Sequence, residues 1–306
     1  MNIVSTKANY NSDVLIADLS KLKNTYGFLD VFSIGKSVLG KHIPCVKLGT
    51  GSKKVFYSAA MHANEWITSP LLMKFIEDFC KAYVSDDKIF GYSATEIFNS
   101  CTIFITPMCN PDGVDLVTGL IPSNSDTYAK AKQIASKHPS IPFPSGWKAN
   151  IQGTDVNLQF PAGWENAKTI KFSQGFTGPA PRDYVGPSPL SAPEAKAVYD
   201  FTLLHDFSLI LAYHTQGKEI YWQFKDYAPE IAEQIGEEFA AVSGYALADV
   251  PYNSSFAGYK DWFLQEYQKP GYTVEAGIGE NPLPIEQFDE IYKDNLGILV
   301  LGAILA

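Results

Sequence analysis

The stretch Val55–Trp66 constrains the fold more than any other part of the sequence. It begins as an apolar strand and turns polar at His62 and Glu65, just before a helical pattern starts. Open α/β sheets place their ligand sites at such strand ends. A spacing of three lets an imidazole and a carboxylate converge on one ion, and zinc accepts both ligand types. The same spacing also occurs at an ordinary capped helix start, so a metal site needs further support.

Two later strands repeat this arrangement. The apolar run 207–213 ends in His214, and the run 272–274 ends in Glu275. A histidine at the end of a strand is often no more than a hydrogen-bonded residue. Three strands that each end in a metal-competent or acid–base residue nevertheless favour a functional site on one sheet edge. The remaining histidines have no such placement and are interpreted as structural or solvated: His42, His138 and His205.

The composition is that of an ordinary globular enzyme. The chain has 306 residues, of which 46% are hydrophobic and 19% charged. Strand and helix patterns alternate without a linker or an internal repeat. We therefore expect one α/β domain over residues 1–306, with a central mixed, mostly parallel sheet flanked by helices. The net charge of −9 argues against nucleic acid or an anionic membrane as a partner.

The cellular compartment is predicted from the N-terminus and the cysteines. The first residues lack the apolar core of a signal peptide, and no apolar run reaches a membrane span of about 20 residues. The four cysteines lie mostly in apolar segments without a C-x-x-C pattern, which is typical of buried thiols in a reducing compartment. We expect a cytoplasmic protein, unless a leader was removed.

The segment 118–190 differs from the rest of the chain. It is rich in proline and glycine, and one helical piece is expected near Tyr128–Lys137. Its aromatic residues argue against disorder, so we interpret it as the wall of a cleft. After it, a helix is predicted over Ala192–Leu204, with Ser191 as N-cap and Glu194 completing a capping box.

The strand-end residues resemble those of the zinc-dependent carboxypeptidase family. In that family the ligands and the base come in the order seen at His62, Glu65, His214 and Glu275. Three further stretches resemble family motifs and extend the resemblance over nearly the whole chain: Asn110–Val114 (N-P-D-G), Gly153–Phe160 (G-x-D-x-N-R-N-F) and the pair Asp261-Trp262. The resemblance implies one zinc ion on His62, Glu65 and His214.

The sequence departs from the family pattern at Leu158. Digestive members of the family have an arginine there that grips the terminal carboxylate of the substrate, and a leucine cannot form that bidentate pair. The local sequence instead resembles a bacterial subgroup of γ-D-glutamyl-L-diamino acid peptidases. The resemblance implies a cell-wall (murein) peptide as substrate, cut between D-glutamate and diaminopimelate or lysine. It leaves the oligomeric state open.

The resemblance also implies roles for individual residues. Glu275 would accept a proton from the attacking water and deliver it to the leaving amine. Lys148 stands where the family has an arginine facing the oxyanion, although an exposed lysine is the alternative interpretation. Three residues are candidates for substrate binding: Tyr252 as the family's mobile tyrosine (with Tyr259 in the same loop), Asn157 for a carboxylate, and Arg182 for an anionic group or as a simple exposed loop residue.

Two other functions fit the same residues. One is a zinc-binding but non-hydrolytic protein that recognises a wall peptide, and Glu275 argues against it because binding alone needs no base. The other is an ordinary carboxypeptidase or an amidohydrolase that acts on a different amide. A comparison of γ-D-glutamyl-diaminopimelate peptides with plain C-terminal peptides as substrates separates these possibilities.

Overall fold

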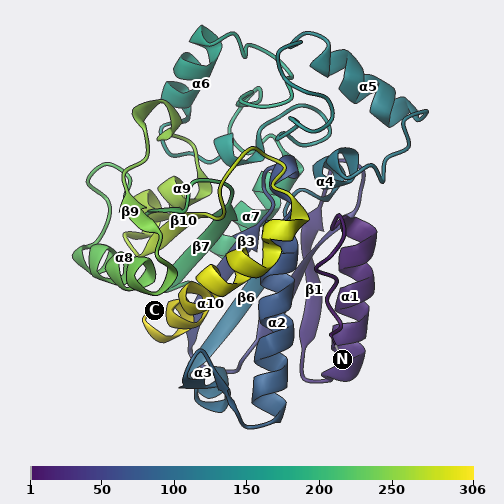
Figure 1. The fold of residues 1–306 in the computed structure, drawn as a ribbon. Coiled ribbons are helices and arrows are strands. Elements are labelled where there is room, and N and C mark those ends of the chain that lie inside the picture. Colours follow the sequence, from purple (N-terminus) through teal and green to yellow (C-terminus); the bar gives the residue numbers. More distant parts are fainter. Residues whose placement is uncertain (1) are drawn as a thin grey trace.

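The chain folds into an α/β structure in which one large sheet lies between helices (Figure 1). The computed structural model describes residues 2–306. Eight strands form the sheet in the order β1-β2-β6-β3-β7-β10-β8-β9. Their bounds are β1 Asp30–Lys36, β2 His42–Leu48, β3 Lys53–Ala59, β6 Cys101–Thr106, β7 Leu209–His214, β8 Glu219–Tyr221, β9 Ala246–Ala248 and β10 Gly271–Glu275. A separate small hairpin joins β4 Lys88–Ile89 and β5 Tyr92–Ser93.

The helices differ in length, and α2 and α10 are the longest with 17 residues each. The α-helices are α1 Ser12–Thr25, α2 Thr68–Val84, α3 Ala94–Ser100, α4 Pro111–Val117, α5 Asp126–Ala135, α6 Trp164–Ser173, α7 Pro193–Leu203, α8 Glu230–Ser243, α9 Tyr259–Tyr267 and α10 Phe288–Ile304. Four 3-10 turns complete the set: η1 Ala63–Glu65, η2 Val156–Leu158, η3 Tyr252–Ser254 and η4 Ile285–Gln287.

The middle of the sheet is parallel, and it joins the flanking strands on either side in antiparallel fashion. Strands β6, β3, β7 and β10 run parallel to one another, whereas β2 joins β6 and β8 joins β10 in antiparallel fashion. The predicted mixed, mostly parallel sheet is therefore confirmed. The parallel middle brings the carboxyl ends of β3, β7 and β10 to one edge, and Glu275 pairs with His214 in register.

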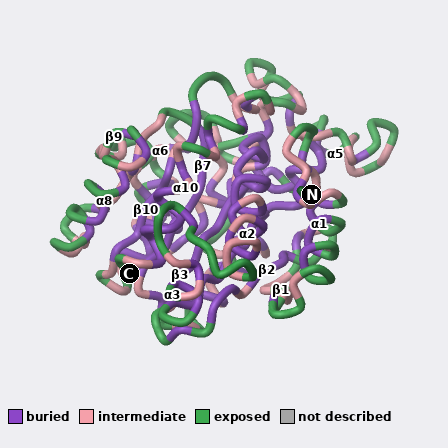
Figure 2. The backbone as a smooth tube through the Cα atoms, turned by 60° about the horizontal axis from the view of Figure 1, so that its bottom comes forward, coloured by how far each residue is buried: buried purple, intermediate pink, exposed green. Residues whose placement is uncertain are grey.

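Each face of the sheet has its own hydrophobic core. Alternate residues of a strand point to opposite faces, so Tyr57 packs on the side of α2 and α10 while Phe56 packs on the side of α7 and α9. The hydroxyl of Tyr57 donates to the carbonyl of Leu299 in α10 at 2.9 Å. Figure 2 shows the central strands buried and the outer helices exposed along one side. Burial on both faces explains why the central strands are continuous apolar runs.

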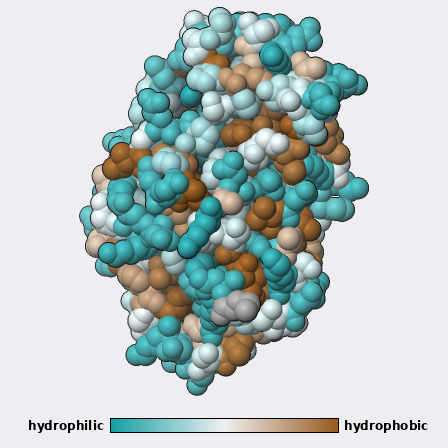
Figure 3. All heavy atoms as spheres, turned by 45° about the vertical axis from the view of Figure 1, so that its right-hand side comes forward, coloured by the Kyte–Doolittle hydropathy of each residue, from teal (hydrophilic) through white to brown (hydrophobic). Residues whose placement is uncertain are grey.

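The face of the molecule drawn in Figure 3 is largely hydrophilic. On the side drawn in Figure 3, hydrophobic side chains form small patches between hydrophilic ones. Within residues 2–306, none of the helices combines the length and the apolar character that a membrane span requires. The four cysteines are buried free thiols, and burial raises the pKa of each.

The segment 118–190 lies with the strand ends at one end of the molecule (Figure 1). It contains the expected helix as α5, two residues earlier than predicted at each end, and a second helix, α6, that was not predicted. Helix α6 lacks a side-chain cap and starts after Gly163, whose φ of 66° is left-handed. The missing cap removes the signal by which a helix start is recognised in a sequence.

The predicted capping box at the start of α7 is wrong. The helix begins at Pro193, and Ala192 occupies the N-cap without a side-chain hydrogen bond. Ser191 donates instead to the Oε1 of Gln159 at 2.9 Å. Glu194 accepts from the backbone N–H of Val38 and from Asn150. Ser191 and Glu194 thus form hydrogen bonds with residues distant in the sequence instead of capping α7.

The Asn110–Gly113 turn fastens β3 to the neighbouring loop. The amide of Asn110 donates to the carbonyls of Met61 and Ala149, at 3.1 and 3.0 Å, and its oxygen accepts from the N–H of Gly113. Gly113 leaves no room for a side chain, because a Cβ there would lie 2.7 Å from the carbonyl oxygen of Ala149. The turn therefore holds the segment before His62 against the loop that carries Lys148.

We expect Asn110→Ala to destabilise the protein by about 2–4 kcal/mol. The substitution strands two buried carbonyls and one buried N–H, and each such group costs about 1–3 kcal/mol, partly relieved by relaxation. Urea unfolding followed by tryptophan fluorescence measures the change. Asn124→Ala, in an exposed loop, is the control and should leave the midpoint unchanged. An unchanged midpoint in Asn110→Ala would show that the hydrogen bonds of Asn110 do not stabilise the fold.

Candidate metal centre

Three side chains from two strand ends converge on one point. His62 and Glu65 follow β3, and His214 ends β7. The Nδ1 atoms of the two histidines lie 3.1 Å apart, and each approaches one oxygen of Glu65, at 2.9 and 2.8 Å. One ligand atom from each residue lies within 4.8 Å of the other two. The predicted set His62, Glu65 and His214 is therefore brought together.

This donor set fits zinc. Two imidazole nitrogens and one carboxylate are a common catalytic zinc set, which leaves a further position for water or substrate. Two Nδ1 atoms that face each other over a shared carboxylate leave room for only one cation between them. The side chains of Glu65 and His214 are only 1% and 2% exposed, so an ion here is enclosed by protein on one side.

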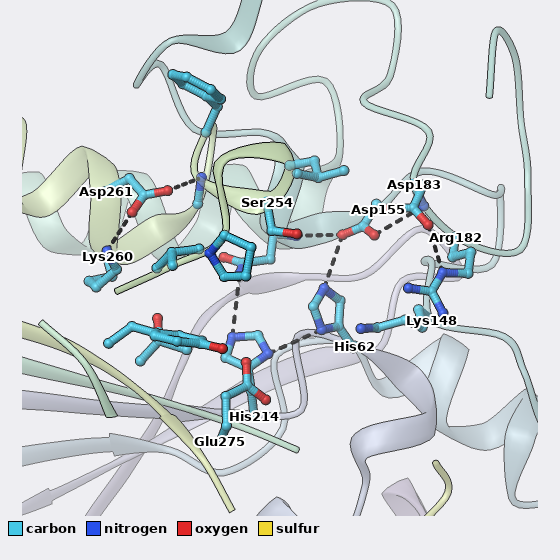
Figure 4. A pocket seen from close by; sticks show the side chains of 18 of the residues that line it. His62, Lys148, Asp155, Arg182, Asp183, His214, Ser254, Lys260, Asp261 and Glu275 are labelled. Carbon is cyan, nitrogen blue, oxygen red and sulfur yellow. Dashed lines mark hydrogen bonds and ion pairs between the residues drawn. The ribbon is translucent and has the colours of Figure 1, made fainter. Parts of the chain in front are cut away.

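Asp155 holds one of these ligands in place, a role that we did not predict. Its Oδ1 lies 3.1 Å from the Nε2 of His62, on the side of the ring away from the metal cluster. A carboxylate in this position fixes the tautomer and the orientation of a metal-bound histidine. The aspartate stands inside the Gly153–Phe160 motif, which was the available signal. His62 and Asp155 are drawn with their contact in Figure 4.

The charges in the cluster shift one another strongly. Burial alone would lower the pKa of His62, but the carboxylates of Glu65 and Asp155 outweigh it and raise this pKa to about 9. Burial also lowers the pKa of His214. The pKa of Glu65 is held well below its usual range by His62 and Lys148, against the effect of burial. These shifts favour an imidazolium at His62 beside the carboxylate of Glu65.

Glu275 faces this cluster from β10. Burial and the negative charge of Glu65 raise the pKa of Glu275 to about 8, while Lys148 and His62 oppose the shift. A carboxyl whose pKa is moved toward neutrality by its surroundings is suited to accept and return a proton. The structure places Glu275 beside the metal cluster without making it a member.

Lys148 contacts the metal cluster through Glu65. Its Nζ lies 2.9 Å from the Oε1 of Glu65, and its side chain is 17% exposed. The backbone around it is fixed, because its carbonyl accepts from the N–H of Ala63 and its N–H donates to the carbonyl of Pro181. The alternative of an exposed lysine beside a tryptophan is thus wrong: the charge points into the site.

Two cavities meet at these residues. One, of about 250 Å³, is lined by His62, His214, Asn157 and Leu158, among others. The second, of about 520 Å³, is lined by Asn64 and by the loop around Asn281. Four residues line both: Lys148, Arg182, Tyr221 and Glu275. The two cavities therefore adjoin each other beside the metal cluster.

The predicted substrate-binding residues differ in their placement. Asn157 lines the smaller cavity, but its oxygen accepts from the N–H of Tyr259 at 2.9 Å. Arg182 lines both cavities, its side chain is 44% exposed, and its Nε lies 2.6 Å from the carboxylate of Asp183. Arg182 is therefore an exposed loop arginine that also borders both cavities, and its role in substrate binding stays a prediction.

Tyr252 lies away from the metal cluster. It is 69% exposed and lines a third cavity that contains none of the metal ligands. Its ring packs edge-on against Phe256 at 5.3 Å, which turns it outward. A contact with substrate thus requires η3 to move. Tyr259, the other tyrosine of that loop, is fully buried and hydrogen-bonds Thr202, so it is unsuited to the role.

Purified protein should contain about one zinc ion per chain, and His214→Ala should lose it. Removing one of three ligands leaves a site that cannot compete with water for the ion. Elemental analysis after dialysis measures the content. His42→Ala, which alters an exposed histidine, is the matched control and should keep its zinc. Full zinc content in both His62→Ala and His214→Ala would contradict the assignment.

Zinc affinity should fall as the pH falls below about 9. His62 has a raised pKa of about 9 in the metal-free protein, so below that pH its proton must leave before the nitrogen can bind zinc. The apparent affinity should drop roughly tenfold per pH unit for this one proton. Competition with a chelator between pH 6 and 9 measures it. A flat profile would mean that His62 is neutral before the metal arrives.

The chain matches known proteins along almost its full length. Residues 15–297 match the zinc carboxypeptidase family. The γ-D-glutamyl-L-diamino acid endopeptidase 1 of Lysinibacillus sphaericus is 45% identical over 303 residues, which cover 99% of this chain and 74% of that protein.

Solved structures share the fold. Bovine thrombin-activatable fibrinolysis inhibitor superposes with a TM-score of 0.73 at 16% identity, covering 98% of this chain and 97% of that one. The murein-tripeptide amidase MpaA of Escherichia coli O157 reaches 0.54 at 16% identity, covering 89% and 91%. With a zinc-competent triad, a carboxylate beside it, and a family match over nearly the whole chain, this protein is a zinc metallopeptidase and belongs to the zinc carboxypeptidase family.

Proposed function

We propose that this enzyme hydrolyses the bond between γ-D-glutamate and a diamino acid in bacterial cell-wall peptides. The similarity to the L. sphaericus endopeptidase carries the proposal, because it extends over 99% of the chain at 45% identity. The site supports it independently. Leu158 lines the cavity beside the metal ligands, where a carboxypeptidase needs a cation for the terminal carboxylate.

The residues of the chain divide the chemistry among them. Zinc, when bound to its three ligands, supplies a water of lowered pKa and a Lewis acid for the carbonyl. Glu275 takes the proton from the attacking water and transfers it to the nitrogen of the leaving diamino acid. Lys148 places a positive charge where the carbonyl oxygen becomes negative. A preorganised donor of this kind is worth roughly 3 kcal/mol in the transition state.

Anionic groups of the substrate need local cations, because the protein as a whole carries a net charge of −9. Arg182 lines both cavities and so lies within reach of a carboxylate on either side of the bond. Its ion pair with Asp183 uses the Nε and leaves the two terminal nitrogens of the guanidinium for a substrate. Arg182 therefore takes over part of the role that Leu158 cannot perform.

Glu275→Gln should keep zinc and lose most of the activity. Glutamine retains the shape of the side chain but accepts no proton, and general acid–base catalysis is worth roughly 100- to 10,000-fold in rate. Zinc content and hydrolysis are measured on the same preparation, and Glu286→Gln, an exposed glutamate, is the control. Hydrolysis at a near wild-type rate would mean that another base operates.

The enzyme should cleave L-Ala-γ-D-Glu-diaminopimelate faster than hippuryl-type peptides. Position 158 carries a leucine and so lacks the arginine with which digestive carboxypeptidases hold the α-carboxylate of a hippuryl-type peptide. A ratio of kcat/KM values measures the preference. Leu158→Arg should shift this ratio toward ordinary C-terminal residues, and Leu158→Met, which keeps the site apolar, is its control. Faster cleavage of hippuryl peptides by the wild type would make this an ordinary carboxypeptidase.

A further inference from the structure

Glu194 is a buried carboxylate to which the hydrolytic chemistry described above gives no role. It lies in the first turn of α7 and is 0% exposed. Its Oε1 accepts from the backbone N–H of Val38, and its Oε2 accepts from the side-chain amide of Asn150, both at 3.0 Å. Burying a carboxylate is costly unless its oxygens are hydrogen-bonded, so these two contacts must account for its place in the fold.

Asn150 is the centre of a tight turn. Its Oδ1 accepts from the N–H groups of Gln152 and Thr154, both at 3.1 Å. Its backbone N–H donates to the carbonyl of Thr154 at 2.8 Å, and its own carbonyl accepts from the N–H of Gly153 at 2.9 Å. The same carbonyl accepts from the indole N–H of Trp147 at 3.1 Å. Asn150 thus defines the path of the chain from Trp147 to Thr154.

The carboxylate of Glu194 decides which way the amide of Asn150 points. An ionised carboxylate only accepts hydrogen bonds, so Asn150 must turn its NH2 group toward Glu194. The amide oxygen then faces the backbone N–H groups of Gln152 and Thr154. In the reversed orientation the NH2 group would face these two donors. Glu194 therefore selects the one orientation of Asn150 that keeps the turn hydrogen-bonded.

The turn carries a residue of the site on each side of Asn150. Lys148 precedes it and places its Nζ 2.9 Å from the Oε1 of Glu65. Asp155 follows it and holds the Nε2 of His62 at 3.1 Å. Figure 4 shows both side chains beside His62. A displacement of about 1 Å in a catalytic group can cost roughly 100-fold in rate, so the shape of this turn matters for the reaction.

We propose that Glu194 is a positioning residue that acts on the reaction through Asn150 and Lys148. This inference rests on the proposed function, in which Lys148 faces the developing oxyanion. Glu194 itself lines neither the 250 Å³ nor the 520 Å³ cavity. Loss of its carboxylate should therefore lower kcat, which depends on the oxyanion contact, and leave KM nearly unchanged.

An exchange of the two functional groups tests the contact. Glu194→Gln turns a donor toward either Val38 or Asn150, and Asn150→Asp brings two carboxylates together. The double variant, which combines both substitutions, restores every hydrogen bond. The amide at position 194 then accepts from Val38 and donates to the carboxylate at position 150, which in turn accepts from Gln152 and Thr154. The net charge of the double variant equals that of the wild type.

Both single variants should lose activity, and the double variant should regain it. With L-Ala-γ-D-Glu-meso-diaminopimelate as substrate, kcat per bound zinc should fall roughly tenfold or more in each single variant, with KM within about twofold of the wild type. Glu230→Gln, which alters an exposed glutamate in the first turn of α8, is the matched control. A double variant no more active than Glu194→Gln would overturn the inference.

A cycle with Lys148 separates positioning from a general loss of stability. Lys148→Met should lower kcat roughly 100-fold, as removal of an oxyanion donor does. Adding Glu194→Gln should then cost no more, because the group through which Glu194 acts is already gone. Losses that multiply would overturn the inference. If the wild type cleaves only hippuryl-type peptides, the proposed function fails, and the same cycle on that substrate still decides the role of Glu194.

The indole of Trp147 reports on the turn without catalysis, because it donates to the carbonyl of Asn150. Its N–H signal in an NMR spectrum, assigned with Trp147→Phe, should shift in Glu194→Gln and return to its wild-type position in the double variant. A signal that does not move in Glu194→Gln would show that the carboxylate does not set the turn.

Discussion

The buried carboxylate of Glu65 is the group on which this site depends most. Its side chain is 1% exposed, and it contacts His62 at 2.9 Å, His214 at 2.8 Å and Lys148 at 2.9 Å. A carboxylate at this depth without partners would cost several kcal/mol. The end of β3, the end of β7 and the loop before Asn150 must therefore meet at one point, and the parallel middle of the sheet is what aligns the first two.

Hydrogen bonds from other parts of the fold fix the segments that carry the metal ligands and Lys148. The Asn110 turn ties the start of the Lys148 loop to β3, and Asp155 fixes His62 from the segment that forms the cleft wall. The walls themselves are loops and short helices gathered at one end of the sheet (Figure 1). The sheet thus positions the metal ligands and Glu275, whereas the surrounding loops form the walls of the cleft.

The charged side chains around the cavities form pairs of opposite charge. Lys148 faces Glu65, Arg182 faces Asp183, and Lys260 faces Asp261. Paired charges are tolerated at low exposure and need not conflict with a net charge of −9. Leu158, uncharged among them, excludes the single strong carboxylate clamp of a digestive carboxypeptidase.

The sequence by itself determined the parallel middle of the sheet and placed His62, Glu65, His214 and Glu275 at the ends of its strands. These depend on periodicity and on which residue ends a strand, and both are local properties. Only the tertiary structure decided that Asp155 supports His62, 93 residues away, that Lys148 points into the site, that Ser191 serves Gln159 instead of capping α7, and that Tyr252 faces outward. Polar side chains choose among all partners within reach, and for distant residues that reach exists only after the sheet and its loops have packed.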